Sequence, residues 1–495
     1  MPAPPRLDMW IDGTWRSAQN GRTFDDRSPW DQSVVATVPA GDADDTRDAV
    51  AAAAAAFPSW AAARPADRQR VFLNAAAQVE ARAAEIRDLL AVETGCGAHY
   101  AALQTAFTAS LFTQAAQIPY RATGEVTPSD RAGTTALVRR RPVGVIGAIP
   151  PWNAAVILSA RAIAVPLAAG NTVVLKPSEE SPWSGGVLLA DIFEKAGLPA
   201  GVLNVVTHAP GEAGVVAEAL VSSPDVRRLN FTGSTATGRR LAELAARHLK
   251  PLLLQLSGHN PLIVLADADL AGAARSAAYG SFVHQGQVCM CCRRIFVEEP
   301  VAERFTAAFV AEAERLGVGD PRDPATIVGP LVNEWALHLI DRRVSDAVGG
   351  GARVLTGGKA APPCYPPTVL TDVPADCELS QEETFGPVAI VEPVADADAA
   401  VARANDSPWA LSAGIMTGDE MAGLRLAHRL TAGMVHINDQ PVNDEPHMPF
   451  GGSRESGWGR FGTGPGIDEF TEPQLITTRS SPRDPFGGRG APTPS

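Results

Sequence analysis

The chain has 495 residues, of which 45% are hydrophobic and 20% charged, and its formal net charge is −13. This composition is ordinary for a globular protein with about two or three domains, and it excludes a small disulfide-stapled scaffold. Negative charge without a long basic run argues against nucleic acid and anionic membranes as partners. The sequence contains no run of about eighteen apolar residues, so no membrane span is predicted.

The two ends of the chain carry no motif. Residues 1–8 are proline-rich and residues 483–495 are rich in glycine, proline and serine, so we expect both to be disordered. The start lacks a positive segment followed by an apolar stretch, which predicts a cytoplasmic protein. Six cysteines in so long a chain suit reduced thiols better than a disulfide framework.

The first half of the chain alternates between strand and helix patterns. Apolar residues at helical spacing predict helices over 48–56 and 65–90. Short apolar runs predict strands over 143–149, 172–175, 202–206 and 226–231, and helices are expected over 154–169, 182–196, 211–220 and 235–248. Ser181 is a plausible N-cap of the second of these. Alternation of this kind predicts an α/β fold with an open parallel sheet, whose ligands bind at the carboxyl ends of the strands.

A second α/β region is expected to begin beyond Lys250. Its strands are predicted near 252–256, 262–264, 294–297, 352–355, 388–391 and 434–438, with a helix from Asp269. The segment 124–141 resembles a hairpin that stands apart, and 475–478 could pair with it. Exposed edges of this type often serve subunit contact.

Polar residues follow the ends of two predicted strands. Lys176 and Glu179 come directly after one strand, and Phe231 to Gly238 ends another strand and opens a helix. Glycines and hydroxyls at a helix N-terminus suit an anion, although a glycine turn before a helix is usually only a turn. The usual three-glycine dinucleotide motif is absent.

Three cysteines cluster in the stretch GSFVHQGQVCMCCRR, which spans 280–294. Glycines at 280 and 286 would let a substrate approach Cys289, which makes it a candidate nucleophile. Buried packing is the ordinary role of a cysteine and the expected one for Cys291 and Cys292. Cys289 and Cys292 also form a C-x-x-C pair, but no second pair follows, so we expect no metal site.

Six motifs in this order resemble the aldehyde dehydrogenase superfamily. They are Pro151-Trp152-Asn153, Lys176-Pro177-Ser178-Glu179, Phe231-Thr232-Gly233-Ser234-Thr235 with Gly238, Gly286-Gln287-Val288-Cys289, Glu382-Glu383-Thr384-Phe385-Gly386-Pro387 and Pro449-Phe450-Gly451-Gly452. The stretches 284–290 and 437–445 look most like the branch that oxidises benzaldehyde and vanillin, which implies an aromatic aldehyde as the small-molecule substrate.

The resemblance implies a three-part subunit that assembles as a homodimer or homotetramer. A Rossmann-like cofactor domain would comprise 9–120 and 142–254, with 451–470 returning to it. A catalytic domain would span 255–450, and an oligomerisation hairpin and strand would comprise 121–141 and 471–482.

The resemblance also implies the roles of individual residues. Cys289 would attack the aldehyde, and Asn153 with the Cys289 N–H would hold the oxyanion. Lys176 and Glu179 match a ribose-binding pair, and the carboxylate favours NAD over NADP. The cofactor-binding set is Ile149, Trp152, Lys176, Ser178, Glu179, Phe231, Gly233, Ser234, Glu383 and Phe385.

One motif departs from the family pattern. The family usually has a Leu-Glu-Leu-Gly-Gly segment whose glutamate activates the water that hydrolyses the thioester, and here the segment contains Gln255. An amide can orient a water but cannot accept its proton near neutral pH. Three explanations stay open: Glu472 acts as a proton relay, the acyl group passes to a thiol such as coenzyme A, or the protein is an NAD-binding module with weak turnover.

Overall fold

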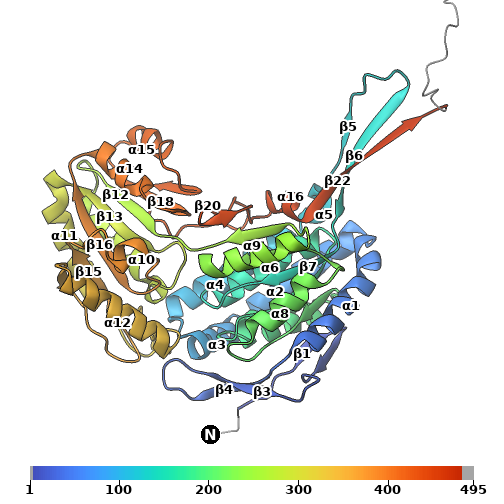
Figure 1. The fold of residues 1–495 in the computed structure, drawn as a ribbon, viewed down its shortest axis with the longest axis horizontal. Coiled ribbons are helices and arrows are strands. Elements are labelled where there is room, and N and C mark those ends of the chain that lie inside the picture. Colours follow the sequence, from blue (N-terminus) through green and yellow to red (C-terminus); the bar gives the residue numbers. More distant parts are fainter. Residues whose placement is uncertain (1–3, 482–495) are drawn as a thin grey trace, which may run out of the picture.

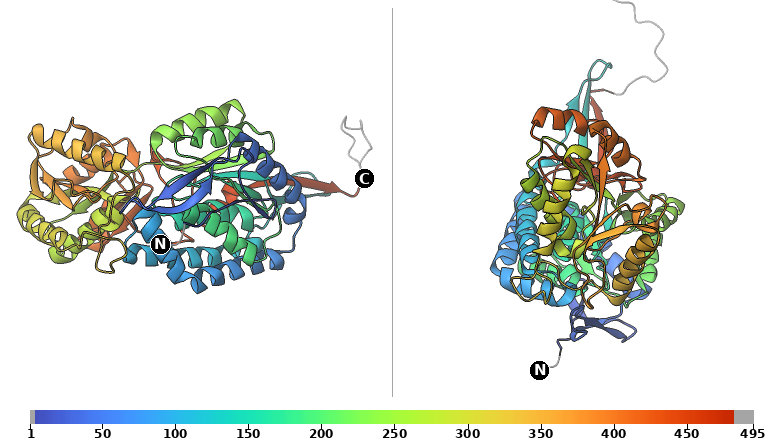
Figure 2. Two further views of the ribbon diagram at one scale, coloured as in Figure 1. Left: turned by 90° about the horizontal axis from the view of Figure 1, so that it is seen from below. Right: turned by 90° about the vertical axis from the view of Figure 1, so that its left-hand side faces the viewer.

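The computed structural model describes residues 4–481, and three sheets organise that part of the chain (Figure 1). An eight-stranded and a seven-stranded sheet form two α/β units, and a three-stranded sheet projects from the eight-stranded side (Figures 1 and 2). Two short ladders complete the strands: β3 (Thr23–Arg27) with β4 (Val34–Pro39), and β17 (Trp409–Ala410) with β20 (Ser453–Arg454).

The eight-stranded sheet is parallel at its centre. Its order is β2 (Thr14–Arg16), β1 (Met9–Ile11), β9 (Leu203–Val205), β8 (Thr172–Leu175), β7 (Val145–Ile149), β10 (Val226–Thr232), β11 (Leu252–Gln255) and β21 (Gly457–Trp458). The strands from β9 to β11 run parallel, and all residues of β7 and β8 are buried. Helices cover both faces of these strands, which explains why the strands are uninterrupted apolar runs (Figure 1).

The helices of this unit are α1 (Ala43–Ala61), α2 (Pro65–Ala81), α3 (Ala83–Thr94), α4 (Ala98–Ala115), α5 (Ile118–Arg121), α6 (Ala155–Ala168), α7 (Leu188–Lys195), α8 (Ala213–Ser222) and α9 (Thr235–Arg247). Most of them overlap the predicted ranges, but the range 65–90 divides into α2 and α3, and α4 and α5 were not predicted. Every residue of α6 is buried. This helix fills the space beside β7 and α4, so it needs no polar face.

Three sequence predictions for this unit are wrong. The strand that begins at Leu252 does not open the second region, because it continues the first sheet, with Leu254 opposite Phe231. The helix expected from Pro182 begins with the π-helical turn η1 (Trp183–Val187), and Ser181 does not cap it. The Glu93 carboxylate takes that place by accepting hydrogen bonds from the backbone of Trp183 (2.7 Å) and Ser184 (2.9 Å).

The N-terminal segment is more ordered than its composition predicts. The Leu7 N–H donates to the Thr37 carbonyl (2.9 Å), and the Leu7 side chain is buried against Val38 and Val187. An apolar anchor therefore holds this part of a segment that was expected to be disordered. The predicted disorder of 483–495 lies outside the described residues.

The seven-stranded sheet forms the second unit. Its order is β14 (Arg353–Thr356), β15 (Thr368–Thr371), β16 (Val388–Val394), β13 (Cys292–Glu298), β12 (Asn260–Val264), β18 (Ser412–Met416) and β19 (Met434–Ile437). Its helices are α10 (Leu270–Phe282), α11 (Glu299–Glu314), α12 (Glu334–Gly349), α13 (Glu378–Gln381), α14 (Ala397–Asn405) and α15 (Glu420–Ala427). The 3-10 turn η2 (Val283–Gly286) follows α10 and leads to the cysteine cluster.

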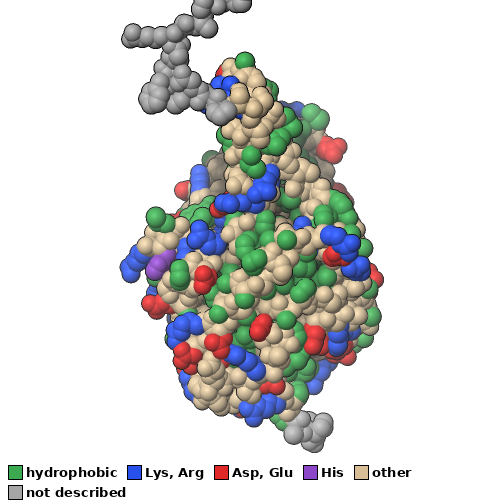
Figure 3. All heavy atoms as spheres, turned by 90° about the vertical axis from the view of Figure 1, so that its right-hand side faces the viewer, with side chains coloured by type: hydrophobic (Ala, Val, Ile, Leu, Met, Phe, Trp, Pro, Cys, Tyr) green, Lys and Arg blue, Asp and Glu red, His purple; other side chains and the backbone are tan. Residues whose placement is uncertain are grey.

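The projecting sheet joins distant parts of the sequence. Strand β6 (Thr134–Pro142) pairs with β5 (Glu125–Thr127) and with β22 (Thr471–Arg479), which follows the short helix α16 (Gly466–Phe470). Leu475 lies opposite Val138, so the predicted pairing is confirmed. Hydrophobic side chains are visible on this projection in Figure 3, and Val126 and Leu475 are 74% and 64% exposed. Within 4–481, no helix is long and apolar enough to cross a membrane.

Candidate active site

A strained backbone presents Cys289. His284, Gln285 and Gly286 all have positive φ angles (50°, 56° and 67°), a region that non-glycine residues rarely adopt. A side chain at Gly286 would meet the Gly386 carbonyl oxygen at 2.2 Å, so only glycine fits there. The Gln285 amide holds the loop by donating to the carbonyls of Gly95 (2.7 Å) and Pro330 (2.8 Å).

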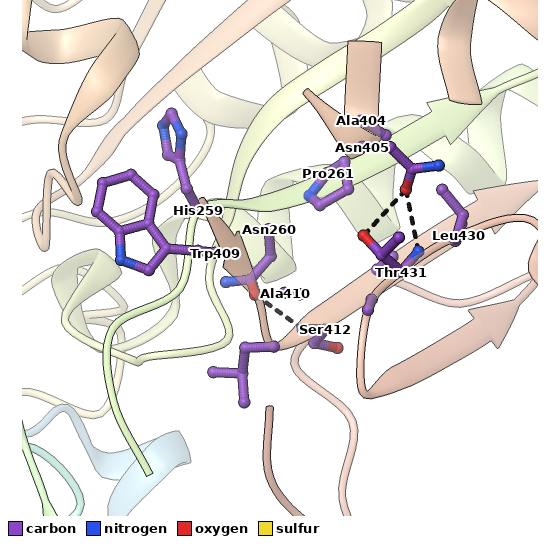
Figure 4. Close-up of a pocket in the computed structure, with 13 residues that line it drawn as sticks. His259, Asn260, Pro261, Ala404, Asn405, Trp409, Ala410, Ser412, Leu430 and Thr431 are labelled. Carbon is purple, nitrogen blue, oxygen red and sulfur yellow. Dashed lines mark hydrogen bonds between the residues drawn. The ribbon is translucent and has the colours of Figure 1, made fainter. Parts of the chain in front are cut away.

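Asn260 fixes the backbone on the other side of the nucleophile. Its side-chain amide donates to the carbonyls of Cys289 (2.9 Å) and Cys291 (3.0 Å), while its oxygen accepts from the Ser412 N–H (3.0 Å). Figure 4 shows the bond to Ser412, next to a small pocket bordered by His259 and Trp409. The loop is thus fastened directly to β18.

Two cavities meet at Cys289 and Asn153. One has a volume of about 590 Å³ and the other about 420 Å³, and among residues 4–481 these two are the only ones that line both. The Asn153 amide donates to the Gln287 carbonyl (2.8 Å), which holds it beside the thiol. A reacting carbon at Cys289 could therefore be reached from opposite sides.

The larger cavity is walled by aromatic rings around one cation. The guanidinium of Arg161 lies 4.1 Å from the ring centre of Phe450 and 5.3 Å from that of Phe107, and it is ion-paired with Asp444. Tyr100 also lines this cavity. None of these residues was predicted for the site, although a single arginine within the apolar run 154–169 was a signal that could have identified one of them.

The smaller cavity ends at a helix N-terminus. It runs from Cys289 past Trp152 and Phe385, whose ring centres are 5.7 Å apart, to Gly233 and Ser234 before α9. The Ser234 hydroxyl accepts from the Thr237 N–H (3.3 Å). The open backbone of this glycine turn, the helix dipole and the aromatic walls fit a dinucleotide whose phosphates lie at the helix start. Ile149 and Phe231 are buried strand residues behind this wall.

Lys176 and Glu179 lie together with a histidine. The Lys176 ammonium is 2.6 Å from His208 Nε2, and the Glu179 carboxylate is 3.7 Å from the same nitrogen. Burial lowers the pKa of Lys176 to about 8. Ser178 donates to Glu179 (3.4 Å). Glu179 also lines a third cavity, of about 330 Å³. Asn333 and Trp335 line both this third cavity and the smaller cavity that leads from Cys289 to the start of α9.

Comparison with known proteins decides the family. Residues 15–476 match the model of the aldehyde dehydrogenase family. The chain is 45% identical over 477 residues to a vanillin dehydrogenase of Pseudomonas fluorescens, covering 96% of this chain and 98% of that protein. It is 39% identical over 460 residues to a benzaldehyde dehydrogenase [NAD(+)] of Pseudomonas putida, covering 92% and 94%.

A solved structure agrees with the sequence comparison. The crystal structure of a salicylaldehyde dehydrogenase from Pseudomonas putida G7 complexed with salicylaldehyde has a TM-score of 0.95 and 38% identity, and the match covers 98% of this chain and 100% of that one. The protein belongs to the aldehyde dehydrogenase family. The predicted family and fold class are therefore confirmed, and the chain is an oxidoreductase that acts on aldehydes. The family uses NAD or NADP.

In this aldehyde dehydrogenase the Cys289 thiol is half-buried and protonated at rest. Burial is the largest influence and raises its pKa to about 12, and the charge of Glu383 adds to this. A hydrogen bond with Gln255 and the charge of Arg161 act in the opposite direction. Formation of the thiolate therefore requires a proton acceptor or a positive charge brought into the site.

Gln255 lies at the predicted position beside the nucleophile. It lines the cavity of Cys289 and Trp152, and its Nε2 donates to the Leu256 carbonyl (3.1 Å). Its Oε1 is buried and has no partner within the described chain. An unpaired buried acceptor of this kind is costly, so a donor such as water fits there.

The structure does not bring Glu472 to Cys289. Glu472 lies in β22 opposite Arg141, and its carboxylate is 3.6 Å from that guanidinium. It lines neither of the two cavities that contain the thiol. The prediction that Glu472 relays the proton during hydrolysis fails because the residue belongs to the projecting sheet.

Proposed function

We propose that this enzyme oxidises an aromatic aldehyde to its carboxylic acid with NAD. The observation that carries the proposal is the 590 Å³ cavity beside Cys289, whose walls include Phe107, Phe450 and Tyr100. A benzaldehyde-like ring fills such a cavity by stacking on these side chains. The relatives named for vanillin, salicylaldehyde and benzaldehyde support the same substrate class.

The chain's own residues supply the covalent chemistry. Cys289 Sγ attacks the carbonyl carbon, and the oxyanion that forms accepts hydrogen bonds from the Asn153 amide and the Cys289 N–H. When bound, NAD accepts the hydride of this adduct. A thioester then remains on Cys289 until a nucleophile releases the acyl group.

NAD rather than NADP is the proposed cofactor, with Gly233 and Ser234 at its phosphates and Glu383 and Phe385 at its nicotinamide end. The choice of NAD over NADP is supported by the third cavity, which Glu179 lines. Its acidic lining residues outnumber its single cation, Arg27, even without Asp26, whose pKa burial raises to about 10: they are Asp25, Glu179, Glu180 and Glu334. A carboxylate favours a free ribose hydroxyl and repels a 2′-phosphate.

We also propose that the projecting sheet joins subunits. Val126 and Leu475 expose apolar surface on an element whose edge is open, which suits pairing with a second copy of the chain. In this scheme 9–120 and 142–254 bind the cofactor, 255–450 carry the nucleophile, and 121–141 with 471–482 form the subunit contact. A homodimer and a homotetramer both satisfy it.

The direct test is oxidation of benzaldehyde, vanillin and salicylaldehyde, followed as NADH formation with NAD and with NADP. We expect turnover with NAD and an aromatic aldehyde. The absence of even a single-turnover burst with all three aldehydes would contradict the proposal. Binding of NAD without aldehyde oxidation would instead identify a cofactor-binding module.

Gln255 favours a second candidate, in which coenzyme A receives the acyl group. A thiolate attacks a thioester without a base that deprotonates water, so the missing glutamate would matter less. Added coenzyme A should then raise steady-state turnover and yield an acyl-coenzyme A. Unchanged turnover and free acid as the product would reject this candidate.

A further inference from the structure

Hydrolysis of the thioester on Cys289 requires a group that takes a proton from water, and this inference rests on the function proposed above. Gln255 cannot be that group, because an amide is not basic near neutral pH. Glu472 is remote from both cavities of the thiol. The structure therefore has to offer another carboxylate.

The carboxylates of the aldehyde-side cavity are poorly suited to the task. This is the cavity of Arg161 and Phe450, and its acidic residues are Asp439, Asp444 and Glu445. Asp444 is ion-paired with Arg161, and Asp439 accepts hydrogen bonds from Gln440 and Asn443. The Glu445 side chain is 55% exposed and its carboxylate lies 3.8 Å from His447. In the cavity that contains both Cys289 and Gln255, the acidic lining residues are Glu382 and Glu383.

Glu383 is held beside the nucleophile, whereas Glu382 is exposed at the cavity rim. The Glu383 carboxylate accepts a hydrogen bond from the Gly258 N–H (3.2 Å) and another from the Ser257 hydroxyl. Gly258 packs so closely on the Cys289 backbone that an added side chain would meet the Cys289 carbonyl oxygen at 2.6 Å. The charge of Glu383 is also the strongest of the charges that act on the thiol.

Gln255 provides a hydrogen-bond acceptor that can hold a water molecule near Cys289. Its buried Oε1 has no partner in the part of the chain that the structure describes, and its side chain lines the same cavity as the thiol. A water that donates one hydrogen to this oxygen would lie in the cavity that Cys289 and Glu383 also line. Its other hydrogen would be available to a base.

We propose that Glu383 is the general base of thioester hydrolysis in this protein and that Gln255 orients the water it deprotonates. The water oxygen forms a bond to the acyl carbon as one proton passes to the Glu383 carboxylate. The tetrahedral adduct collapses with cleavage of the C–S bond, which releases the carboxylic acid and the Cys289 thiolate. The proton on Glu383 then returns to solvent or to the thiolate, and no oxidant or reductant is needed.

The surroundings of Glu383 are compatible with this role. Burial raises the pKa of its carboxyl, while hydrogen bonds from Ser257 and Gly258 and the charges of Arg293 and Arg343 lower it. The net direction is upward, which brings a carboxylate closer to the basicity that general-base catalysis requires. Cys289 and Glu382 are further titratable groups that line the cavity of Glu383, and the charge of Glu383 acts on the Cys289 thiol.

Hydrolysis of p-nitrophenyl acetate without any nicotinamide cofactor tests the proposal on the full-length enzyme. The ester acylates Cys289 directly, so the burst of p-nitrophenol measures acylation and the following steady rate measures deacylation. Because no cofactor takes part, a role of Glu383 in holding the nicotinamide ribose cannot influence the result. The variants are Glu383→Gln, Glu383→Asp and the exposed control Glu382→Gln.

We expect Glu383→Gln to keep the burst amplitude and to lower the steady rate by about 10²-fold or more, since a positioned base contributes typically 10²–10⁴-fold. Glu383→Asp should retain an intermediate rate, and Glu382→Gln should match the wild type. The wild-type steady rate should rise with pH through a carboxyl ionisation, and Glu383→Gln should lose that rise. Adding Gln255→Glu to Glu383→Gln should restore fast deacylation.

Two results would overturn the proposal. One is an unchanged steady rate in Glu383→Gln, and the other is loss of the burst itself, which would place Glu383 in acylation or folding. Ester hydrolysis that persists at the wild-type rate in Cys289→Ala would instead refute the nucleophilic role of Cys289 and with it the proposed function. The two failures are therefore distinguishable in one assay.

Discussion

The two cavities that meet at Cys289 differ in how they treat their polar groups. On the aldehyde side the charge of Arg161 is neutralised by Asp444 and covered by Phe450, so the site presents mainly apolar surface. On the cofactor side Gln255 keeps an unpaired oxygen. The start of α9 and the carboxylate of Glu383 also open onto that side.

This difference implies that one cavity selects the substrate and that the other supports the reaction steps. Under the proposed function, the paired charges and aromatic walls select the aldehyde, because they contribute contact area and exclude water. Unpaired polar groups bind transient charges and water, which is what acyl transfer requires. Changes on the two sides should therefore alter different kinetic quantities.

Removal of the nucleophile, which lines both cavities, should have the largest effect. Cys289→Ala should lower aldehyde oxidation on the order of 10⁴-fold or more, because the covalent path disappears. NADH formation would measure this, with NAD binding by fluorescence as evidence of an intact cofactor side. Cys291→Ala is the control, since that thiol is fully buried and packs in the core. Substantial turnover in Cys289→Ala would reject the assigned nucleophile.

A change on the aldehyde side should affect stability first. Arg161→Met leaves Asp444 as a buried charge without its partner, in a pair whose side chains are 4% and 11% exposed. Loss of one member of a buried pair typically costs about 3–5 kcal/mol. Urea unfolding would measure this cost. The double variant Arg161→Met with Asp444→Leu should recover most of the lost stability, and failure to recover would show that Arg161 contributes through its ring contacts instead.

Loss of one oxyanion donor should have the next largest effect. Asn153→Ala should lower the rate of the NADH burst about 10²- to 10³-fold, the typical cost of removing one such donor. The residue also donates to the Gln287 carbonyl, so thermal unfolding must accompany the kinetics. A slower burst in a protein of normal stability supports the oxyanion role. A normal burst would mean that the Cys289 N–H alone is sufficient.

Much of the fold could be predicted because its signals are local. The buried strands β7 and β8 are uninterrupted apolar runs, and helices such as α2 carry apolar residues at helical spacing. The assignment of Leu252–Gln255 to the wrong sheet shows the limit, because pairing with β10 is a tertiary choice that the strand pattern does not encode. The η1 turn was missed for a similar reason, since its cap is Glu93, ninety residues earlier in the chain.

The residues of the candidate site also divide into those that local motifs predict and those that only the tertiary structure brings together. Cys289, Asn153 and Gln255 lie in recognisable motifs, and the structure places them around one pair of cavities. Arg161 and Asp444 were not predicted, because they are far apart in sequence and only folding makes them a pair. Glu472 illustrates the opposite error, in which a sequence position suggested a role that its strand in the projecting sheet does not allow.

The smallest expected effect concerns the choice of cofactor. Glu179→Ser removes one carboxylate from the end of the site proposed to hold the ribose, where His208 and Lys176 lie within reach of it. We expect the preference for NAD over NADP, measured as the ratio of kcat/KM values, to fall about tenfold, which corresponds to about 1.4 kcal/mol. The neighbouring Glu180→Gln is the matched control, since its carboxylate instead accepts a hydrogen bond from Asn333 (2.8 Å). An equal change in both variants would mean that the general negative potential of this cavity selects the cofactor. A change confined to Glu179→Ser would mean that direct recognition of the ribose does so, and that the cofactor side discriminates by single polar contacts where the aldehyde side relies on shape.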